Sequence, residues 1–450
     1  MAAAAARPPL PTYIPWRQGA WRRHLLNESH HSVCLDGTPG AFSFWPAVLP
    51  VRNTHWIIAF QGGGWCWTPQ DCALRAASKM GSSSYWHPPV EGGILARSCH
   101  VAPEFCTYNK VLFEYCDGAS FSGDANITTR SARGHASTLV SAGRAIVRAG
   151  IIALIRHYGL SKATDVLVTG SSAGGLAALL HAADIRDALV KSGAPLSRFK
   201  LLSISGLFFL PPTTRSDATR SRPFEQQLSS IFRLAKMEVS AGCLSKFESN
   251  DAWKCLAGVE PLESLAADIP VFVVQSTFDL FSTSCILGAG SSSYFELNCS
   301  SGAWAPCLRW MTPLGRRTAQ RICSEEQREQ LAKYQRVAAV ALANSQRLNL
   351  GGSGAFIHSC HDHASYTNAW LGHRDHNTTM RAVVLRWWDA PVTRVRDADV
   401  YRVGDCGEFS QHDHTCPQKC GEWRPNFYAD PRSKLIARIR ALGLPFPSAK

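Results

Sequence analysis

The stretch DVLVTGSSAGGLAALLH, residues 165–181, changes character in its middle. Its first residues are mostly apolar or β-branched, as in a buried strand, and it ends in an alanine- and leucine-rich run typical of a helix. Between them, residues 170–174 read GSSAG and match G-x-S-x-G, in which a serine occupies a strained strand-to-helix turn above a sheet. The spacing makes Ser172 the candidate nucleophile and Ser171 a small neighbour. A Gly/Ser loop that merely begins a helix is the alternative.

Strand and helix patterns alternate along the rest of the chain. Several strand candidates are continuous apolar runs, as in a parallel sheet that is buried on both faces. The expected strands are residues 55–60, 111–115, 165–170, 199–205 and 270–276. The expected helices are residues 136–157, 173–190, 223–240, 324–345 and 378–388. This alternation predicts one α/β domain with a mostly parallel, doubly wound sheet.

Composition divides the 450 residues into three expected parts. Residues 1–30, with an alanine run and several prolines, form an N-terminal segment that we expect to be loosely ordered. Residues 31–428 form the α/β domain, since large enzymes with long loops reach this size without splitting. Residues 429–450 read as a basic helix with a tail, either a solvated surface helix or an attachment to a membrane or cell wall.

The 16 cysteines indicate an oxidising compartment. They are scattered from Cys34 to Cys420, which favours disulfides over zinc, and Cys66 and Cys72 are close enough for a local bridge. The chain lacks the apolar core of a signal peptide and any run of about 18 uncharged apolar residues. We therefore expect a secreted protein with long disulfide-bonded loops and no transmembrane segment, whose targeting segment is absent here or unusual. Four glycosylation sequons agree with secretion, at Asn27, Asn126, Asn298 and Asn377.

The charge balance points to an anionic partner. Lys and Arg number 47 against 34 Asp and Glu, a formal net charge of +13. Such a surplus suits a nucleic acid, an anionic lipid or an acidic polysaccharide. Because no recognised nucleic-acid motif is present and the basic residues are not concentrated in one arm, we expect no nucleic-acid partner.

A second glycine cluster supplies candidate donors for an oxyanion. The segment HWIIAFQGGGWCW, residues 55–67, places three glycines directly after an expected strand. Glycines let backbone N–H groups approach a substrate carbonyl closely. Together with the N–H of Ala173, which follows the candidate nucleophile, Gly63 and Gly64 are the expected oxyanion hole. A plain turn is the alternative.

Four sequence blocks together resemble a known family. They are QGGGWCW, YCDGASFSGD, GSSAGGLAALLH and GAFIHSCHDH, the last at residues 354–363. In this order they resemble the pectin acetylesterases, whose animal relatives are the Notum carboxylesterases, and they are nearer to the plant branch. The resemblance implies an α/β-hydrolase-like fold and a serine esterase. Because the serine turn already explains catalysis, we expect no cofactor and no metal. Ser171 departs from the cysteine usual there, and SCHDHAS departs from the usual SCFAHCQ.

The order of a Ser–acid–His triad places the acid after a late strand. Asp279 ends the run PVFVVQSTFD, and the resemblance assigns it this role; a turn residue or helix cap is the alternative. The stretch CHDH offers two bases, His361 and His363, which periodicity alone does not separate. The resemblance implies His363, with His361 in the aromatic position of the block.

Candidate substrate contacts surround the glycine loop. Trp65, Trp67 and Phe121 could stack on sugar rings or wall an acyl pocket, although buried core positions are as common for such residues. Asp117 lies in the YCDGASF turn, where a cap suits it as well as a pocket contact.

These observations predict a secreted serine carboxylesterase acting on an acetylated acidic cell-wall polysaccharide such as pectin. A Notum-like esterase acting on a longer acyl group of a protein or lipid is the main alternative. Histidine clusters at residues 361–363, 373–376 and 412–414 suggest a metal-dependent hydrolase as another alternative. HxH pairs without a third ligand at a defined spacing are, however, weak evidence for a metal site. A non-catalytic polysaccharide-binding homologue is the remaining class.

Overall fold

The computed structural model describes residues 13–14, 21–26, 31–47, 53–89, 92–96, 99, 101–130, 134–211, 223–287, 324–358, 363, 374–375, 378–390 and 400–402. Several expected features lie outside these residues: His361, the C-terminal segment 429–450, the cluster at 412–414 and the sequons at Asn27, Asn298 and Asn377. The fourth sequon residue, Asn126, is described and exposed.

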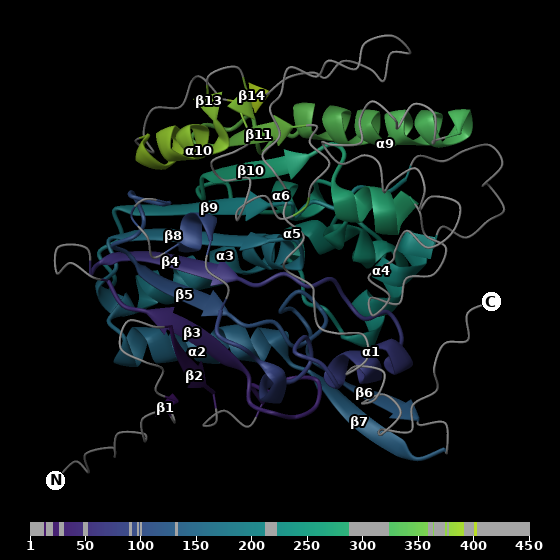
Figure 1. Ribbon diagram of the computed structural model, residues 1–450, viewed down its shortest axis with the longest axis horizontal. Helices are drawn as coiled ribbons and strands as arrows, with labels where there is room; N and C mark the ends of the chain where they lie inside the picture. Colours follow the sequence, from purple (N-terminus) through teal and green to yellow (C-terminus); the bar gives the residue numbers. More distant parts are fainter. Residues whose placement is uncertain are drawn as a thin grey trace.

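A twisted sheet, ten-stranded over the described residues, forms the centre of the molecule (Figure 1). Its order is β1-β2-β3-β5-β4-β8-β9-β10-β11-β14. From β5 to β14 neighbouring strands are parallel, and β1, β2 and β3 extend the sheet in antiparallel fashion. The strands are β1 (Tyr13–Ile14), β2 (Arg22–Leu25), β3 (Ala41–Trp45), β4 (His55–Phe60), β5 (Asn109–Phe113), β8 (Asp165–Ser171), β9 (Arg198–Ile204), β10 (Val271–Ser276), β11 (Gly354–His358) and β14 (Val400–Arg402).

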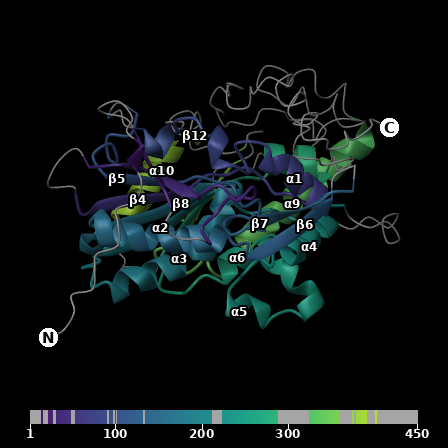
Figure 2. The same ribbon diagram turned by 90° about the horizontal axis from the view of Figure 1, so that it is seen from below.

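Helices cover both faces of this sheet. Figure 2 shows α2 (Gly143–His157) and α3 (Ala173–Lys191) on one side and α10 (Met380–Asp389) on the other. The alternation of β4 explains why: Ile58 and Phe60 pack in the cluster that contains α2 and α3, and Ile57 and Ala59 pack with α10. Each fully buried large apolar side chain contributes about 1.5–3 kcal/mol, so both layers stabilise the domain. The expected doubly wound α/β fold is confirmed.

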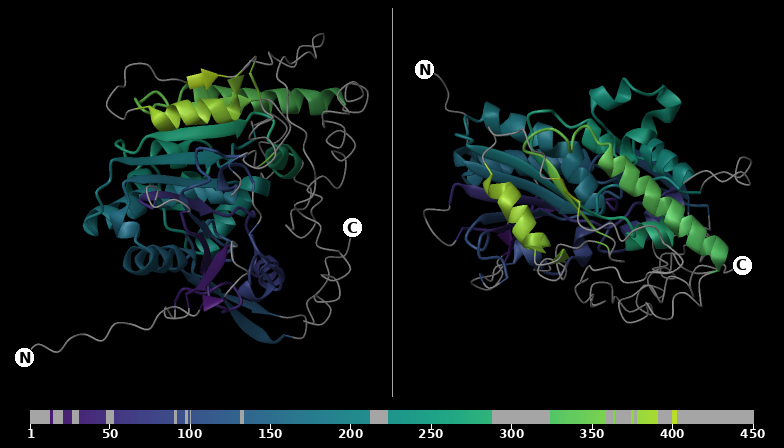
Figure 3. Two further views of the ribbon diagram at one scale, coloured as in Figure 1. Left: turned by 60° about the vertical axis from the view of Figure 1, so that its left-hand side comes forward. Right: turned by 90° about the horizontal axis from the view of Figure 1, so that it is seen from above.

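The remaining elements lie around the ends of the sheet. Figure 3 shows α9 (Glu325–Ala343) with α10 at the β11 side. The others are α1 (Pro69–Ala76), η2 (Ser83–Tyr85), η3 (Gly93–Leu95), β6 (Ala125–Arg130), β7 (Ala136–Ser141), η4 (Leu160–Lys162), α4 (Pro223–Leu234), α5 (Ala241–Leu244), η6 (Ser249–Leu256), α6 (Glu260–Glu263), η7 (Ser282–Leu287), β12 (Arg374–Asp375) and β13 (Thr378–Thr379). No helix within the described segments is long and apolar enough to cross a membrane.

For two helices, the predicted boundary was wrong at one end. The helix expected at residues 136–157 begins only at Gly143, because residues 136–141 form β7 and pair antiparallel with β6. Thr138 and Val140 are β-branched, which favours the strand. The helix expected at 223–240 ends at Leu234; Lys236 has φ +48°, which cannot continue a right-handed helix.

The N-terminal boundary also needs a correction. The four residues of β2 lie inside the segment 1–30 that we expected to be separate, yet they pair with β3 from His24↔Phe42 to Arg22↔Phe44. Arg23 is buried there and its Nε donates to Glu114 Oε1 at 2.8 Å. A buried ion pair and strand pairing therefore join this part of the N-terminal segment to the main domain.

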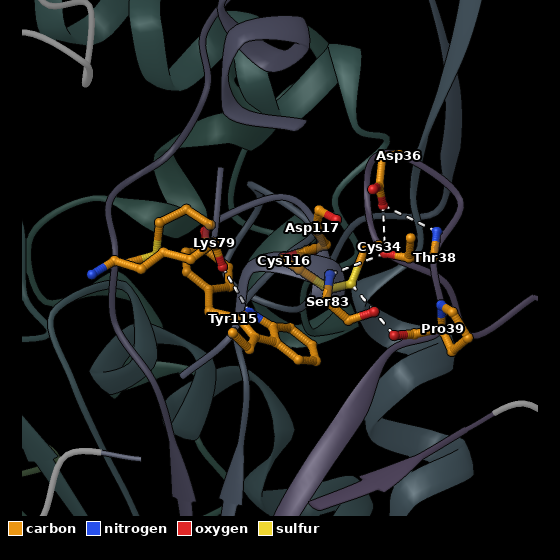
Figure 4. The surroundings of a disulfide bond; sticks show 12 residues. Cys34, Asp36, Thr38, Pro39, Lys79, Ser83, Tyr115, Cys116 and Asp117 are labelled. Carbon is orange, nitrogen blue, oxygen red and sulfur yellow. Dashed lines mark hydrogen bonds between the residues drawn. A yellow bond between two sulfur atoms is a disulfide. The ribbon is translucent and has the colours of Figure 1, made fainter. Parts of the chain in front are cut away.

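Disulfides pin the loops, as expected. Four bridges join described cysteines: Cys34–Cys116, Cys66–Cys72, Cys99–Cys106 and Cys243–Cys255. The first connects the loop before β3 to the turn after β5, across 82 residues (Figure 4). The second confirms the expected local bridge just after the three glycines, across 6 residues.

Candidate active site

The nucleophile turn lies where β8 meets α3. β8 ends at Ser171, and α3 begins at Ala173, so Ser172 alone forms the turn with φ 60° and ψ −130°. This backbone conformation is strained for a non-glycine residue. The Ser172 N–H donates to Ile204 O at 2.9 Å, and its carbonyl accepts from Gly175 N at 2.8 Å. These two backbone hydrogen bonds hold Ser172 at the carboxyl end of β8.

Close backbone contacts explain the glycines of GSSAG. A Cβ added at Gly170 would lie 2.1 Å from Gly174 O. A Cβ added at Gly174 would lie 2.1 Å from Phe60 O, in the neighbouring strand β4. Real Cβ atoms do not approach that closely, so the strand-to-helix turn fits only without side chains at these two positions.

The glycine loop lies directly against this turn. A Cβ added at Gly62 would lie 2.3 Å from Ser171 O and 2.9 Å from Ser172 Cβ. Gly64 has φ +62°, a left-handed conformation that favours glycine. The structure thus brings the segment that contains Gly63 and Gly64 beside Ser172 and the first turn of α3.

Asp279 and His363 form a hydrogen-bonded pair. Asp279 follows β10, is buried, and accepts at Oδ2 from His363 Nδ1 at 2.7 Å. Its other oxygen, Oδ1, accepts the Ser282 N–H at 2.9 Å. With the proton held on Nδ1, the Nε2 of His363 is the nitrogen able to accept a proton from a hydroxyl.

Parallel strands bring these parts to one side of the molecule. The strands β4, β8, β9, β10 and β11 are consecutive parallel neighbours, so their carboxyl ends share one edge, which faces α1 and α4 in Figure 1. The glycine loop follows β4, Ser172 follows β8 and Asp279 follows β10. His363 comes five residues after the last residue of β11, His358. This edge is where open α/β sheets carry their sites.

The candidate aromatic contacts are buried side chains in a connected cluster. Trp65 packs against Trp67 and Phe208, and its Nε1 donates to Ser120 Oγ at 2.8 Å. It also contacts Phe281, whose ring stacks on His363 with centroids 5.6 Å apart. The cluster therefore reaches from the glycine loop to the histidine.

Phe121 and Asp117 make contacts within the fold. Phe121 is buried against Phe60 and Tyr115. The Asp117 carboxylate accepts the N–H groups of three residues in its own turn, Ala119, Phe121 and Gly123. Burial raises the pKa of Asp117, and those three donors and the charge of Arg75 oppose the rise. Of the two roles that the sequence allowed for Asp117, a turn cap and a pocket contact, these hydrogen bonds match the turn cap.

Sequence reasoning did not single out three residues of this region. Phe281, two residues after Asp279, stacks on the histidine. Arg75 and Tyr115 reach the carbonyls of the glycine loop. The available signal was Arg75 itself, a single charged residue in the otherwise apolar helical segment CALRAA.

The site shows no metal-binding cluster within the part of the chain that the structure describes. No group of three His, Cys, Asp or Glu side chains in the described ranges could hold an ion. Most of the histidine clusters noted in the sequence lie outside these ranges.

The fold and this arrangement define an α/β-hydrolase-like protein of the serine carboxylic ester hydrolase class. The chain belongs to the pectinacetylesterase family, whose model matches residues 20–416. Pectin acetylesterase 5 of Arabidopsis thaliana is 30% identical over 363 residues, which cover 79% of this chain and 77% of that protein. Palmitoleoyl-protein carboxylesterase notum1 of Xenopus laevis is 30% identical over 263 residues, 57% of this chain and 51% of that protein. The solved structure of the Wnt deacylase Notum from Drosophila superimposes with a TM-score of 0.66 at 20% identity, covering 88% of this chain and 99% of that one.

Proposed function

We propose that this protein is a secreted serine esterase that removes acetyl groups from an acidic polysaccharide such as pectin. The observation that carries the proposal is the 2.7 Å hydrogen bond between His363 Nδ1 and Asp279 Oδ2, at the sheet edge that also carries the serine turn. Acyl transfer by a serine needs a carboxylate that orients an imidazole, and the serine turn lies at the same sheet edge as this pair.

The reaction passes through an acyl-enzyme. Ser172 Oγ attacks the acetyl carbonyl while His363 Nε2 takes its proton, and Asp279 stabilises the resulting imidazolium. The N–H groups of Gly63, Gly64 and Ala173 bind the oxyanion of the tetrahedral intermediate. The intermediate collapses as His363 returns the proton to the departing sugar hydroxyl. Water, deprotonated by His363, then attacks the acetyl-serine, and the second tetrahedral intermediate collapses as His363 returns the proton to Ser172 Oγ and acetate leaves. No cofactor takes part in these steps.

Charge and family membership support the substrate class. The formal net charge of +13 favours capture of a polyanion, and polygalacturonate is one. Relatives along most of the chain are named pectin acetylesterases. Of the four candidate contacts, we assign Trp65 and Trp67 to the wall of the acyl pocket, because their cluster reaches His363. Phe121 and Asp117 support the turn behind it.

The decisive test is acid release from a panel of esters. We expect acetate from acetylated pectin, less from acetylated xylan, and little acid from long-chain acyl esters. Ser172→Ala should lose essentially all activity, a fall of about 10³-fold or more. Ser171→Ala is the matched control and should keep most of it, because only Ser172 occupies the turn. Comparable activity in the two variants would remove the assigned nucleophile.

The same panel decides the alternative. A clear preference for long acyl chains over acetate would replace the polysaccharide substrate by a Notum-like one, with Ser172 in the same role. Acid release that survives in Ser172→Ala and disappears with a chelator would instead favour a metal-dependent hydrolase.

A further inference from the structure

Two buried side chains hold the carbonyl groups of the glycine loop. Arg75 Nη2 donates to Gly63 O at 2.8 Å, and its Nε donates to Met80 O at 2.9 Å. The Tyr115 hydroxyl donates to Gly64 O at 2.7 Å and accepts the Ser120 N–H at 2.8 Å. Both side chains are buried completely.

Peptide geometry links these contacts to the oxyanion donors. The structure has no cis peptide bond among the described residues, so each carbonyl points away from the N–H of the same peptide. The carbonyl of Gly63 shares its peptide with the N–H of Gly64. By holding the Gly63 carbonyl, Arg75 therefore also fixes the direction of the Gly64 N–H. Tyr115 does the same for the next peptide, between Gly64 and Trp65.

Glycines need such external support. Without a Cβ, successive glycines exchange readily between conformations, so their N–H groups are not aimed by the chain itself. Here the loop is packed from one side: a Cβ added at Gly63 would lie 2.8 Å from Met80 Sδ and 2.9 Å from Tyr115 Cδ1. The Arg75 guanidinium in turn lies 4.9 Å from the centroid of the Tyr115 ring. The two side chains therefore act as one unit behind the loop.

Burying this arginine has a cost that its surroundings offset. A buried cation is expensive unless hydrogen-bonded and balanced by charge. Burial raises the pKa of Asp71 to about 6, and the positive charge of Arg75 opposes that rise; the same opposition acts on Asp117. A charge-assisted hydrogen bond to a carbonyl is stronger than a neutral one, by roughly twofold. The charge is thus placed where it holds one peptide firmly.

We propose that Arg75 and Tyr115 are positioning residues for the oxyanion hole: by holding the carbonyls of Gly63 and Gly64 they fix the peptides on both sides of the Gly64 Cα, so that the N–H of Gly64 faces the developing oxyanion. This inference rests on the proposed function of the serine site, because the loop has an oxyanion to bind only if Ser172 forms an acyl-enzyme. Neither side chain is required to touch the substrate.

The test uses the full chain with two variants and a small neutral substrate, phenyl acetate. Arg75→Lys keeps the charge but loses the planar fork that reaches two carbonyls. Tyr115→Phe keeps the ring and loses the hydroxyl donor. For each, we expect kcat per titrated active site to fall by about 10- to 100-fold with KM unchanged, because the interaction acts on the transition state. Affinity for an alkyl trifluoromethyl ketone, whose serine adduct carries an oxyanion, should fall by the same factor.

Two matched controls separate positioning from stability. Arg347→Lys changes another buried arginine that donates to a backbone carbonyl, Ala266 O at 2.9 Å, near the amino end of β10. Tyr158→Phe removes a hydroxyl that bonds His24 Nδ1 at 2.6 Å. Both controls should keep kcat and ketone affinity.

The outcomes distinguish the inference from the function on which it rests. Unchanged kcat and ketone affinity in Tyr115→Phe and Arg75→Lys would overturn the positioning role; should Arg75→Lys fail to fold, Tyr115→Phe decides alone. Phenyl acetate hydrolysis that survives in Ser172→Ala would overturn the serine mechanism itself. Wild-type hydrolysis of phenyl acetate without release of acetate from pectin would overturn only the polysaccharide substrate and leave the positioning test valid.

Discussion

The two halves of the candidate site are held by different means. In the nucleophile half, the glycine loop and the serine turn touch through backbone, with Gly62 packed against Ser171 and Ser172. In the acid–base half, Asp279 and His363 meet through one side-chain hydrogen bond and the stacked ring of Phe281. The first half should therefore be especially sensitive to an atom added at Gly62, whereas the second should depend on the functional groups of Asp279 and His363. The four experiments below test that difference.

The largest expected effect lies in the acid–base half. His363→Ala removes the partner of Asp279 and the proposed base, so we expect the esterase rate to fall by about 10³-fold or more. Labelling of Ser172 by a fluorophosphonate probe should be lost with it. The matched variant is His361→Ala, which should mainly shift substrate preference or stability. Full activity in folded His363→Ala protein would transfer the role to His361 or remove the triad.

The nucleophile half should respond to a single methyl group. Gly62→Ala places a Cβ against Ser171 O and Ser172 Cβ, so either the loop or the serine must move. We expect kcat per active site to fall by about 10- to 100-fold, since a displaced oxyanion donor costs up to 10²–10³. Gly242→Ala, where nothing lies within 4 Å, is the control and should keep full activity. Equal rates in both variants would contradict the close contact.

The same difference explains how much of the site the sequence predicts. Short motifs predict the nucleophile half, because a strand, a tight turn and a helix are determined by neighbouring residues. Ser172 lies at the strand-to-helix turn that GSSAG predicts. The pairing of Asp279 with His363 joins residues 84 apart, and two histidines competed for it, so residues alone left it open and a family resemblance was needed. Arg75 and Tyr115 went unrecognised because their targets are backbone carbonyls, which no motif records.

The fold follows a similar rule. The buried parallel strands β4, β5, β8, β9 and β10 match the expected positions to within two residues, because apolar runs of that length are distinctive. The β6–β7 hairpin was missed, since its outward residues are exposed and it continues directly into α2. β2 was missed because Arg23 is charged, and its burial becomes acceptable only through distant partners, the Glu114 carboxylate and the carbonyls of Trp86 and His87. Such long-range compensation is invisible to periodicity.

Of the bridges Cys34–Cys116 and Cys66–Cys72, we expect removal of the first to cost more stability and removal of the second to cost more activity. Loop-closure entropy predicts about 4–5 kcal/mol for Cys34–Cys116, which closes 82 residues, and about 2 kcal/mol for Cys66–Cys72, which closes 6. We expect the paired alanine substitutions to follow that order in denaturant unfolding. In kcat per active site the order should reverse, because Cys66 lies two residues after Gly64. A larger kcat loss from the Cys34–Cys116 pair would contradict the idea that Cys66–Cys72 holds the glycine loop in place.

The smallest expected effect is a pH dependence within the nucleophile half. Asp71 Oδ2 accepts the Trp67 N–H at 2.9 Å, and burial raises the pKa of this carboxyl from 3.8 to about 6, with that N–H and Arg75 opposing the rise. Because the folded state binds this proton more tightly than the unfolded chain, the carboxyl's contribution is complete below pH 3.8 and is lost as pH rises through about 6. Asp71→Asn cannot titrate. Relative to wild type, its free energy of unfolding should therefore rise between pH 4 and 6, by about 1–3 kcal/mol, and then level off. Denaturant titrations at pH 4, 5, 6 and 7 measure this difference, and a constant value across the series would show that the pKa of the buried carboxyl near the glycine loop is not raised.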